Sequence, residues 1–162
     1  MTAFDSKHFR SVMGAVPTSV VVVTGFDSVG SPHGITIGSF VSVSLEPPLV
    51  GFLPGVSSKT WLAIRDSRKF CVNVLSASQD ELCWRFAKEA ENRFEGVEWA
   101  PSANGAPALA GSLATLDCEL VSDDQYGDHY FVVGRVTDLS ASDVGDAMAF
   151  YRGKVVGVSH PS

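Results

Sequence analysis

Four consecutive residues, Ser57 to Thr60, could bind a phosphate group. They follow a run typical of a strand and begin SSKTWLAIRDS, a segment typical of a short helix. The first backbone N–H groups of a helix have no partner within it, and here hydroxyl groups and the Lys59 ammonium group accompany them. This combination suits a doubly charged phosphate monoester. The alternative is that Ser57 or Ser58 only caps the helix.

A second group of small polar residues lies upstream, in PHGITIGSFVSVSLEPPLVGF. Gly38, Ser39, Ser42 and Ser44 stand between apolar runs that we expect to form a buried sheet. A hydroxyl group taken out of water without a partner costs about 1–3 kcal/mol, so a polar ligand would explain several of them together. For the last two serines the alternative is turn chemistry beside the two prolines.

One ligand could use both segments, because a single expected strand connects them. Flavin mononucleotide (FMN) fits physically. The nitrogen and oxygen atoms of its ring could meet the hydroxyl and backbone donors of Thr36 to Ser39, while its phosphate group takes the helix start.

The composition predicts one compact domain over residues 1–162, since 45% of the residues are hydrophobic and 19% are charged. A net charge of −6 argues against binding to nucleic acid or to an anionic membrane. The apolar run Val20 to Val23 is too short for a signal-peptide core or a membrane span. We therefore expect a cytoplasmic protein.

The cysteines and histidines show no spacing typical of a metal site. Cys71, Cys83 and Cys118 are far apart and form no C-x-x-C, so we expect three buried thiols. The four histidines are scattered and form no H-E-x-x-H. We expect no bound metal.

The chain alternates β-branched and aromatic runs with turn residues, which predicts a mainly β fold. Strands are expected at 19–26, 33–44, 48–53 and 69–75, a hairpin at 112–136 and a final strand at 149–159. Helices are expected at 4–16, at 57–67 and at 76–94, the last capped by Ser76 or Ser78. Strands without regular helices between them favour a closed antiparallel barrel with a few peripheral helices. Neither G-x-G-x-x-G nor a P-loop motif is present, which argues against Rossmann and P-loop nucleotide binding.

Several motifs resemble the flavin reductase family, whose members have the FMN-binding split-barrel fold. They are FRSVMGAVPTSVVVVT, PHGITIGSFVSVSLEPPLV, SSKTW, KFCVNVL, RFEGVEW and GDHYFVVGRV, in the order and spacing of the family. The resemblance runs from Phe9 to Val156, and the last motif is the most discriminating. It implies a homodimer that uses NADH or NADPH to reduce FMN or FAD, as the small partner of a separate monooxygenase.

The resemblance also implies roles for individual residues. The flavin ring would contact Thr36, Ile37, Gly38, Ser39 and Phe40. The phosphate end would contact Ser57, Ser58, Lys59 and Thr60, and His129 would lie near the nicotinamide. Many family members have Asn where this chain has Gly38 and Gly where it has Ser19. The missing side-chain contact implies looser flavin binding, which suits a protein that uses flavin as a substrate.

His129 belongs to the hairpin motif, and a lone histidine in a hairpin is usually a surface or turn residue. Gly127, however, permits a tight turn, and Asp128 could orient the imidazole ring of a residue at a strand start. Its expected role is to position the nicotinamide, because hydride transfer from NADH to flavin N5 needs no acid from the protein.

Two other functions share parts of this pattern. A flavin-dependent oxidase of the pyridoxamine-phosphate oxidase type would share the barrel and the phosphate site, but not the Gly127-Asp128-His129 hairpin. A flavin-binding module without catalytic activity is the second alternative.

Overall fold

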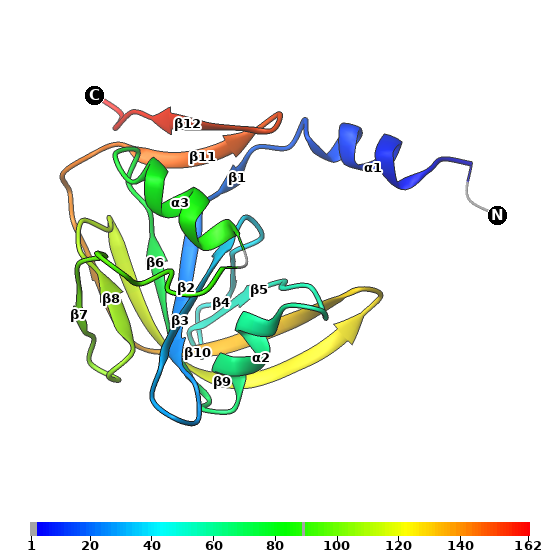
Figure 1. Ribbon diagram of the computed structural model, residues 1–162. Helices are drawn as coiled ribbons and strands as arrows, with labels where there is room; N and C mark the ends of the chain where they lie inside the picture. Colours follow the sequence, from blue (N-terminus) through cyan, green and yellow to red (C-terminus); the bar gives the residue numbers. More distant parts are fainter. Residues whose placement is uncertain (1–2, 89) are drawn as a thin grey trace.

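Antiparallel strands are the main regular elements of the structure, a computed structural model that describes residues 3–88 and 90–162 (Figure 1). The helices are α1 (Ser6–Met13), α2 (Lys59–Arg65) and α3 (Asp80–Ala87). The strands are β1 (Thr18–Ser19), β2 (Val21–Phe26), β3 (Pro32–Ile37), β4 (Val41–Ser44), β5 (Leu49–Phe52), β6 (Lys69–Val74), β7 (Trp99–Pro101), β8 (Pro107–Leu109), β9 (Ala114–Tyr126), β10 (His129–Ala141), β11 (Ala147–Tyr151) and β12 (Lys154–Val158). The predicted mainly β class is confirmed. Across the described residues, no helix has the length and apolar character needed to cross a membrane.

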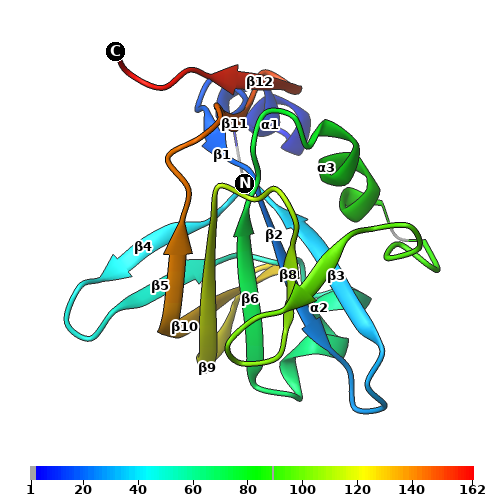
Figure 2. The ribbon, with the colours of Figure 1, turned by 90° about the vertical axis from the view of Figure 1, so that its left-hand side faces the viewer.

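Seven strands form one curled antiparallel sheet in the order β3-β2-β6-β9-β10-β5-β4. This order puts β3 and β4 at its two edges, so among the described strands the barrel is split rather than fully closed. A three-stranded sheet, β1-β11-β12, lies across one end of the barrel, and a two-stranded sheet, β7-β8, lies beside β6 (Figure 2).

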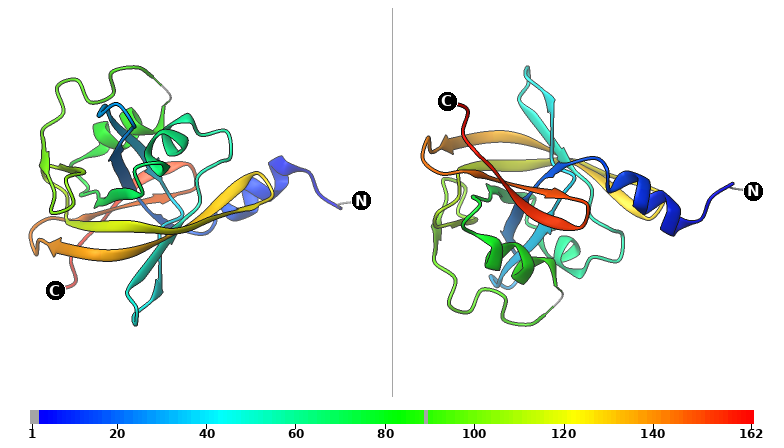
Figure 3. Two further views of the ribbon diagram at one scale, coloured as in Figure 1. Left: turned by 90° about the horizontal axis from the view of Figure 1, so that it is seen from below. Right: turned by 90° about the horizontal axis from the view of Figure 1, so that it is seen from above.

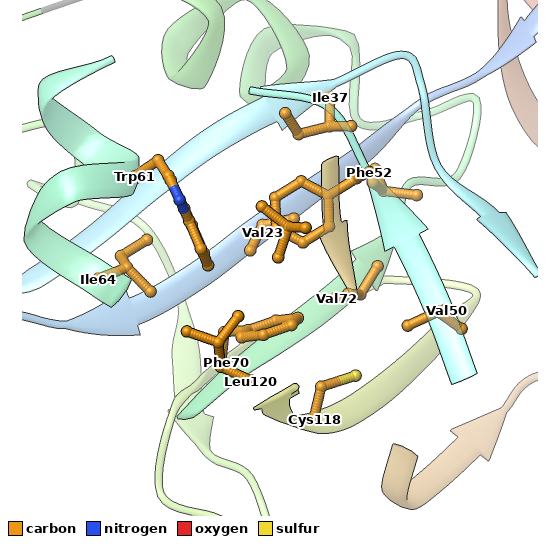
Figure 4. Packing of buried hydrophobic residues seen from close by; sticks show 12 residues of the cluster. Val23, Ile37, Val50, Phe52, Trp61, Ile64, Phe70, Val72, Cys118 and Leu120 are labelled. Carbon is orange, nitrogen blue, oxygen red and sulfur yellow. The ribbon is translucent and has the colours of Figure 1, made fainter. Parts of the chain in front are cut away.

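The barrel interior is filled by large apolar side chains from the strands and from α2 (Figure 4). Phe52, Trp61 and Phe70 are fully or almost fully buried and pack edge to face, with ring centroids 5.3 to 5.9 Å apart. Edge-to-face aromatic pairs add about 0.5–1.5 kcal/mol each to the free energy of burial. They hold α2 firmly against the barrel, which fixes the position of its first residues.

A second apolar cluster lies outside the barrel wall, between β2 and α3. Residues Val21 and Val23 of β2 belong to the barrel interior, while Val22 and the preceding Val20 belong to the second cluster with Phe86 of α3. Alternate residues of a strand point to opposite faces, so a fully apolar run is required where both faces are covered. The run VVVV in the sequence is explained by these two cores.

Helix α1 projects from the barrel on the side of the β9-β10 hairpin tip (Figures 1 and 3). The His8 N–H donates to the Asp5 carboxylate at 2.7 Å, so Asp5 caps the start of the helix. None of its residues is buried, and Phe9, Val12 and Met13 are all about half exposed. The helix predicted at 4–16 is confirmed within the shorter bounds 6–13, and the described residues leave its apolar side chains uncovered.

The helix predicted at 76–94 is wrong in its cap and its length. Gln79, not Ser76 or Ser78, occupies the N-cap, and the helix ends at Ala87. The Ala77 N–H donates to the Asp146 carbonyl at 2.8 Å, which ties this backbone to the segment before β11 and delays the helix start.

The final strand predicted at 149–159 is two strands. Arg152 and Gly153 have φ values of 48° and 78°, and they form a two-residue turn that joins β11 to β12. The short β7-β8 pair was not predicted, because three-residue strands carry too little alternation to be recognised.

Candidate functional site

A cavity of about 990 Å³ lies between the β2-β3 hairpin, the start of α2 and the segment that follows α3. Its lining residues are Ser31 to Gly34, Lys59, Thr60 and residues 90–95. Two of the predicted phosphate ligands, Lys59 and Thr60, therefore face one large space.

The other two predicted phosphate ligands precede α2. Ser58 is its N-cap, and its hydroxyl oxygen accepts from the Trp61 N–H at 3.2 Å. The capping alternative is thus confirmed for Ser58, although its hydroxyl hydrogen can still be donated elsewhere. Ser57 is exposed and lies just outside the helix.

Arg93 is a cavity residue that the sequence analysis did not single out. Its guanidinium group donates to the Thr60 hydroxyl and to the carbonyls of Phe86 and Lys88, the latter two at 3.2 and 3.1 Å. These bonds hold the segment after α3 against α2. The RFEGVEW motif contained the signal, but only the fold places this arginine beside Thr60. Together with Lys59 it gives the cavity wall two cationic groups, which suit an anionic ligand.

The residues predicted to contact a flavin ring lie where β3 ends. The Thr36 hydroxyl donates to the Cys83 carbonyl of α3 at 2.6 Å, and Ile37 points into the barrel core. Both therefore offer mainly their backbone to a ligand. With Gly38 they border a smaller, almost wholly apolar hollow of about 210 Å³ beside Trp84 and Phe150.

Beyond β3 the predicted burial of the small hydroxyl residues is wrong. Ser42 is exposed on β4, an edge strand, so it needs no ligand to replace water. The Ser39 hydroxyl accepts from the Leu53 N–H at 2.9 Å and joins this loop to the end of β5. Phe40 packs against the barrel core, which anchors the loop that starts at Gly38.

His129 begins β10 and lies beside the segment that leads into α2. The Tyr130 N–H donates to the Pro54 carbonyl and the Val56 N–H donates to the Asp128 carbonyl, both at 2.9 Å. The hairpin thus brings His129 next to the residues that precede Ser57. About half of the His129 side chain is exposed, so its ring is accessible to a ligand.

The expected contact between Asp128 and His129 is present, with Oδ1 and Nδ1 2.7 Å apart. This hydrogen bond lowers the pKa of Asp128 below its ordinary value, and the positive charge of Arg10 on α1 acts in the same direction. A lowered carboxyl pKa means that the contact is complete at neutral pH and is lost only as the pH falls through that lowered value.

His33 is a second histidine with a carboxylate partner, and it was expected to be isolated. Its Nε2 lies 2.9 Å from Oδ2 of Asp27, and its ring lines the large cavity. The other oxygen of Asp27 accepts from the N–H groups of Val29 and Ser31. The hydrogen bond from His33 lowers the pKa of Asp27, and the turn amides add to this effect.

The three cysteines are free and buried, as predicted. Burial raises the pKa of the Cys118 thiol to about 12, and it also raises the pKa of Cys83. These thiols therefore remain protonated at neutral pH and take no part in the site.

Comparison with known proteins identifies relatives along nearly the whole chain. Residues 13–159 match the family model described as "Flavin reductase like domain". A flavin reductase of Pseudomonas putida is 47% identical over 152 residues, which cover 94% of this chain and 89% of that protein. The reductase subunit of a flavin-dependent monooxygenase of Rhodococcus jostii is 43% identical, over 96% of this chain and 80% of that subunit.

Solved structures agree with these matches. Nitrilotriacetate monooxygenase component B of Mycobacterium thermoresistibile superposes with a TM-score of 0.91 at 37% identity, over 98% of this chain and 91% of that one. The NADH:FAD oxidoreductase of Streptomyces globisporus, in complex with NAD and FAD fragments, has a TM-score of 0.86 at 33% identity, over 96% of both chains.

Proposed function

This chain belongs to the flavin reductase family, and we propose that its cavity and the Gly38 loop together hold the flavin that it reduces with NADH or NADPH. The main supporting observation is that Lys59, Thr60 and Arg93 lie together on one cavity wall. This wall is beside the start of β3, whereas Gly38 follows the end of β3. The ring and the phosphate group of one flavin nucleotide need such separate, fixed sites.

The phosphate end is assigned to the cavity wall. Lys59 supplies a point charge, Arg93 supplies a planar donor group, and the Thr60 hydroxyl lies in contact with Arg93. Hydrogen bonds to a charged group contribute about 1.5–3 kcal/mol each, so two cations and a hydroxyl suffice for useful affinity.

The ring end is assigned to residues 36–40, chiefly to their backbone groups, since the Thr36 hydroxyl and the Ile37 side chain already have partners. When bound, the flavin supplies the redox chemistry by accepting a hydride at its ring. The protein supplies proximity and orientation. His129, held by Asp128 and half exposed beside residues 54–57, orients the nicotinamide against that ring.

We propose a homodimer because α1 and β4 expose apolar side chains that the described residues of one chain do not cover. Phe9, Val12 and Met13 on α1 and Val41 and Val43 on β4 are each 43% to 59% exposed. Exposed apolar faces of this kind are typical of protein interfaces.

A separate monooxygenase is proposed as the consumer of the reduced flavin. The similar subunit from Rhodococcus jostii is named as the reductase subunit of such an enzyme, which supports a separate oxygenase partner for this chain. We place the protein in the cytoplasm, where reduced nicotinamide nucleotides are available.

Anaerobic mixing of the protein, FMN or FAD, and NADH tests the proposed function. The absorbance of oxidised flavin should bleach at a rate proportional to protein concentration. Flavin that binds without bleaching would identify a passive binding module. Bleaching by pyridoxamine phosphate instead of NADH or NADPH would identify the oxidase.

Gly38 should make flavin exchange rapid. An ideal Cβ at this position would lie 3.2 Å from the Thr18 hydroxyl, so a side chain fits after a small shift, and its absence removes a contact at the ring. The purified protein should lose most of its flavin on dialysis while turning over added FMN. Gly38→Asn should retain flavin at least threefold longer. Stoichiometric flavin after extended dialysis of the parent protein would contradict this expectation.

A further inference from the structure

We propose that Arg65, the last residue of α2, is a positioning residue that holds His129 in place by fixing the β9-β10 hairpin against α2. Its side chain does not line the cavity, so it acts through the hairpin. This inference rests on the proposed function, which assigns the flavin phosphate group to the start of α2 and the nicotinamide to His129. It adds a residue that sets the orientation of these two sites relative to each other.

The end of the hairpin that carries His129 needs support from outside its own two strands. β6 pairs with residues 114–119 of β9, and β5 pairs with residues 132–135 of β10. Beyond these ranges the two strands pair with each other, as far as Tyr126 opposite His129 (Figure 1). A two-stranded hairpin is only marginally stable by itself in water. Its direction therefore depends on further contacts, and these decide where His129 lies.

Arg65 supplies side-chain contacts to both strands of this hairpin. Its Nε atom lies 3.4 Å from Oδ2 of Asp123 on β9, and its guanidinium carbon lies 5.6 Å from the centroid of the Tyr130 ring on β10. Tyr130 is the residue next to His129, and it packs against the barrel core. A guanidinium group is suited to both contacts, because its N–H groups bind carboxylates and its flat face stacks on aromatic rings.

Burial makes this ion pair more than an ordinary surface contact. The side chains of Arg65 and Asp123 are 34% and 20% exposed, and the Oδ2 atom of Asp123 is buried. A fully exposed pair contributes little to stability, whereas removal of one partner from a buried pair leaves an uncompensated charge. Loss of Arg65 should therefore displace the Asp123 carboxylate toward water and move the hairpin with it.

A second attachment joins the hairpin to the segment that leads into α2. The Val56 N–H donates to the Asp128 carbonyl, and the Tyr130 N–H donates to the Pro54 carbonyl, both at 2.9 Å. The hairpin is thus held on either side of α2, before its first residue and at its last. The helix itself is fixed by Trp61, which is fully buried. Two attachments to one fixed helix determine an orientation, whereas a single attachment allows the hairpin to pivot.

Orientation matters because hydride transfer needs the nicotinamide close to the flavin ring and aligned with it. Arg65→Ala should lower the limiting rate of anaerobic flavin reduction about three- to tenfold and change FMN affinity less than about twofold, since it misplaces a positioning group without touching the flavin site. Arg65→Lys keeps the charge and should recover part of the rate. Stopped-flow reduction at several NADH concentrations and fluorescence titration with FMN measure the two quantities.

A double-mutant cycle with His129→Ala distinguishes positioning from general stabilisation. If Arg65 acts through His129, Arg65→Ala should slow the His129→Ala variant less than about twofold, because the group that it positions is gone. Arg152→Ala is the matched control. The Arg152 guanidinium carbon also lies over a tyrosine ring, 5.3 Å from the centroid of Tyr151, but in the turn between β11 and β12 of another sheet. Its loss should leave the rate unchanged.

Three results would overturn the inference. They are a limiting rate of Arg65→Ala equal to that of the parent protein, equal slowing by Arg65→Ala in the parent and in His129→Ala, and a parental rate in His129→Ala itself. Asp123→Asn, which removes the charge of the partner but keeps its size, takes the place of Arg65→Ala if that variant does not fold, and the same criteria apply. Bleaching of flavin by NADH in the parent protein upholds the proposed function in all three cases. Absence of this bleaching would contradict the proposed function, and the inference with it.

Discussion

Replacing His129 with alanine should slow flavin reduction about ten- to hundredfold and leave flavin affinity unchanged. A positioning contact contributes about 1–3 kcal/mol to the transition state, which corresponds to this range of rates. The side chain is half exposed and pairs with the neighbouring Asp128, so its loss should not unfold the barrel. Anaerobic stopped-flow reduction at several NADH concentrations separates the limiting rate from the apparent affinity for NADH.

Asp128→Asn is the matched variant for this experiment. It keeps the size of the side chain but removes the carboxylate that fixes the imidazole ring, so we expect a smaller decrease in rate than for His129→Ala. If both kinetic constants of His129→Ala equal those of the parent protein, His129 is a turn residue. The main argument for a nicotinamide site at the hairpin would then be lost.

Most of the fold could be predicted because its strands carry strong local signals. The four consecutive valines at 20–23, three of them in β2, and the two alternating runs of β9 and β10 have patterns that only a β fold explains. The resemblance of the motifs in these strands to the flavin reductase family predicted that the barrel is split, which periodicity alone cannot reveal.

The errors occurred where distant backbone segments meet. The start of α3 depends on the bond between Ala77 and Asp146, and the exposure of Ser42 depends on β4 being an edge strand. Neither relation is encoded in neighbouring residues. Tertiary pairing decided where α3 begins, despite the local preference of serine for helix caps. It also decided that Ser42 is exposed, despite the apolar residues around it.

The site was predicted in the same uneven way. Lys59 and Thr60 could be found because they begin a helix after a strand, a local signal. Arg93 could not, because it reaches Thr60 from 33 residues away along the chain. Residues recruited from a distance are therefore the ones whose substitution best tests the proposed site.

Arg93→Ala should reduce FMN affinity by a factor of ten to a hundred while leaving riboflavin affinity within twofold. The guanidinium group is bound to the Thr60 hydroxyl and to two carbonyls at the end of α3, so it stands at a fixed place on the cavity wall. One or two charge-assisted hydrogen bonds to phosphate, at about 1.5–3 kcal/mol each, account for the expected loss. Fluorescence titration with both flavins measures it.

Riboflavin is the internal control, because it has the same ring and no phosphate group. Arg85→Ala is the matched variant, since Arg85 also binds a carbonyl of the segment after α3, that of Glu95, but does not line the cavity. If the loss came only from loosening that segment, Arg85→Ala would weaken FMN binding comparably, and Arg93→Ala would weaken riboflavin binding as well. A loss confined to Arg93→Ala and to flavins that carry phosphate places the effect at the phosphate site, at the guanidinium group and the Thr60 hydroxyl that it binds, because no change in the ring site can discriminate between the two ligands.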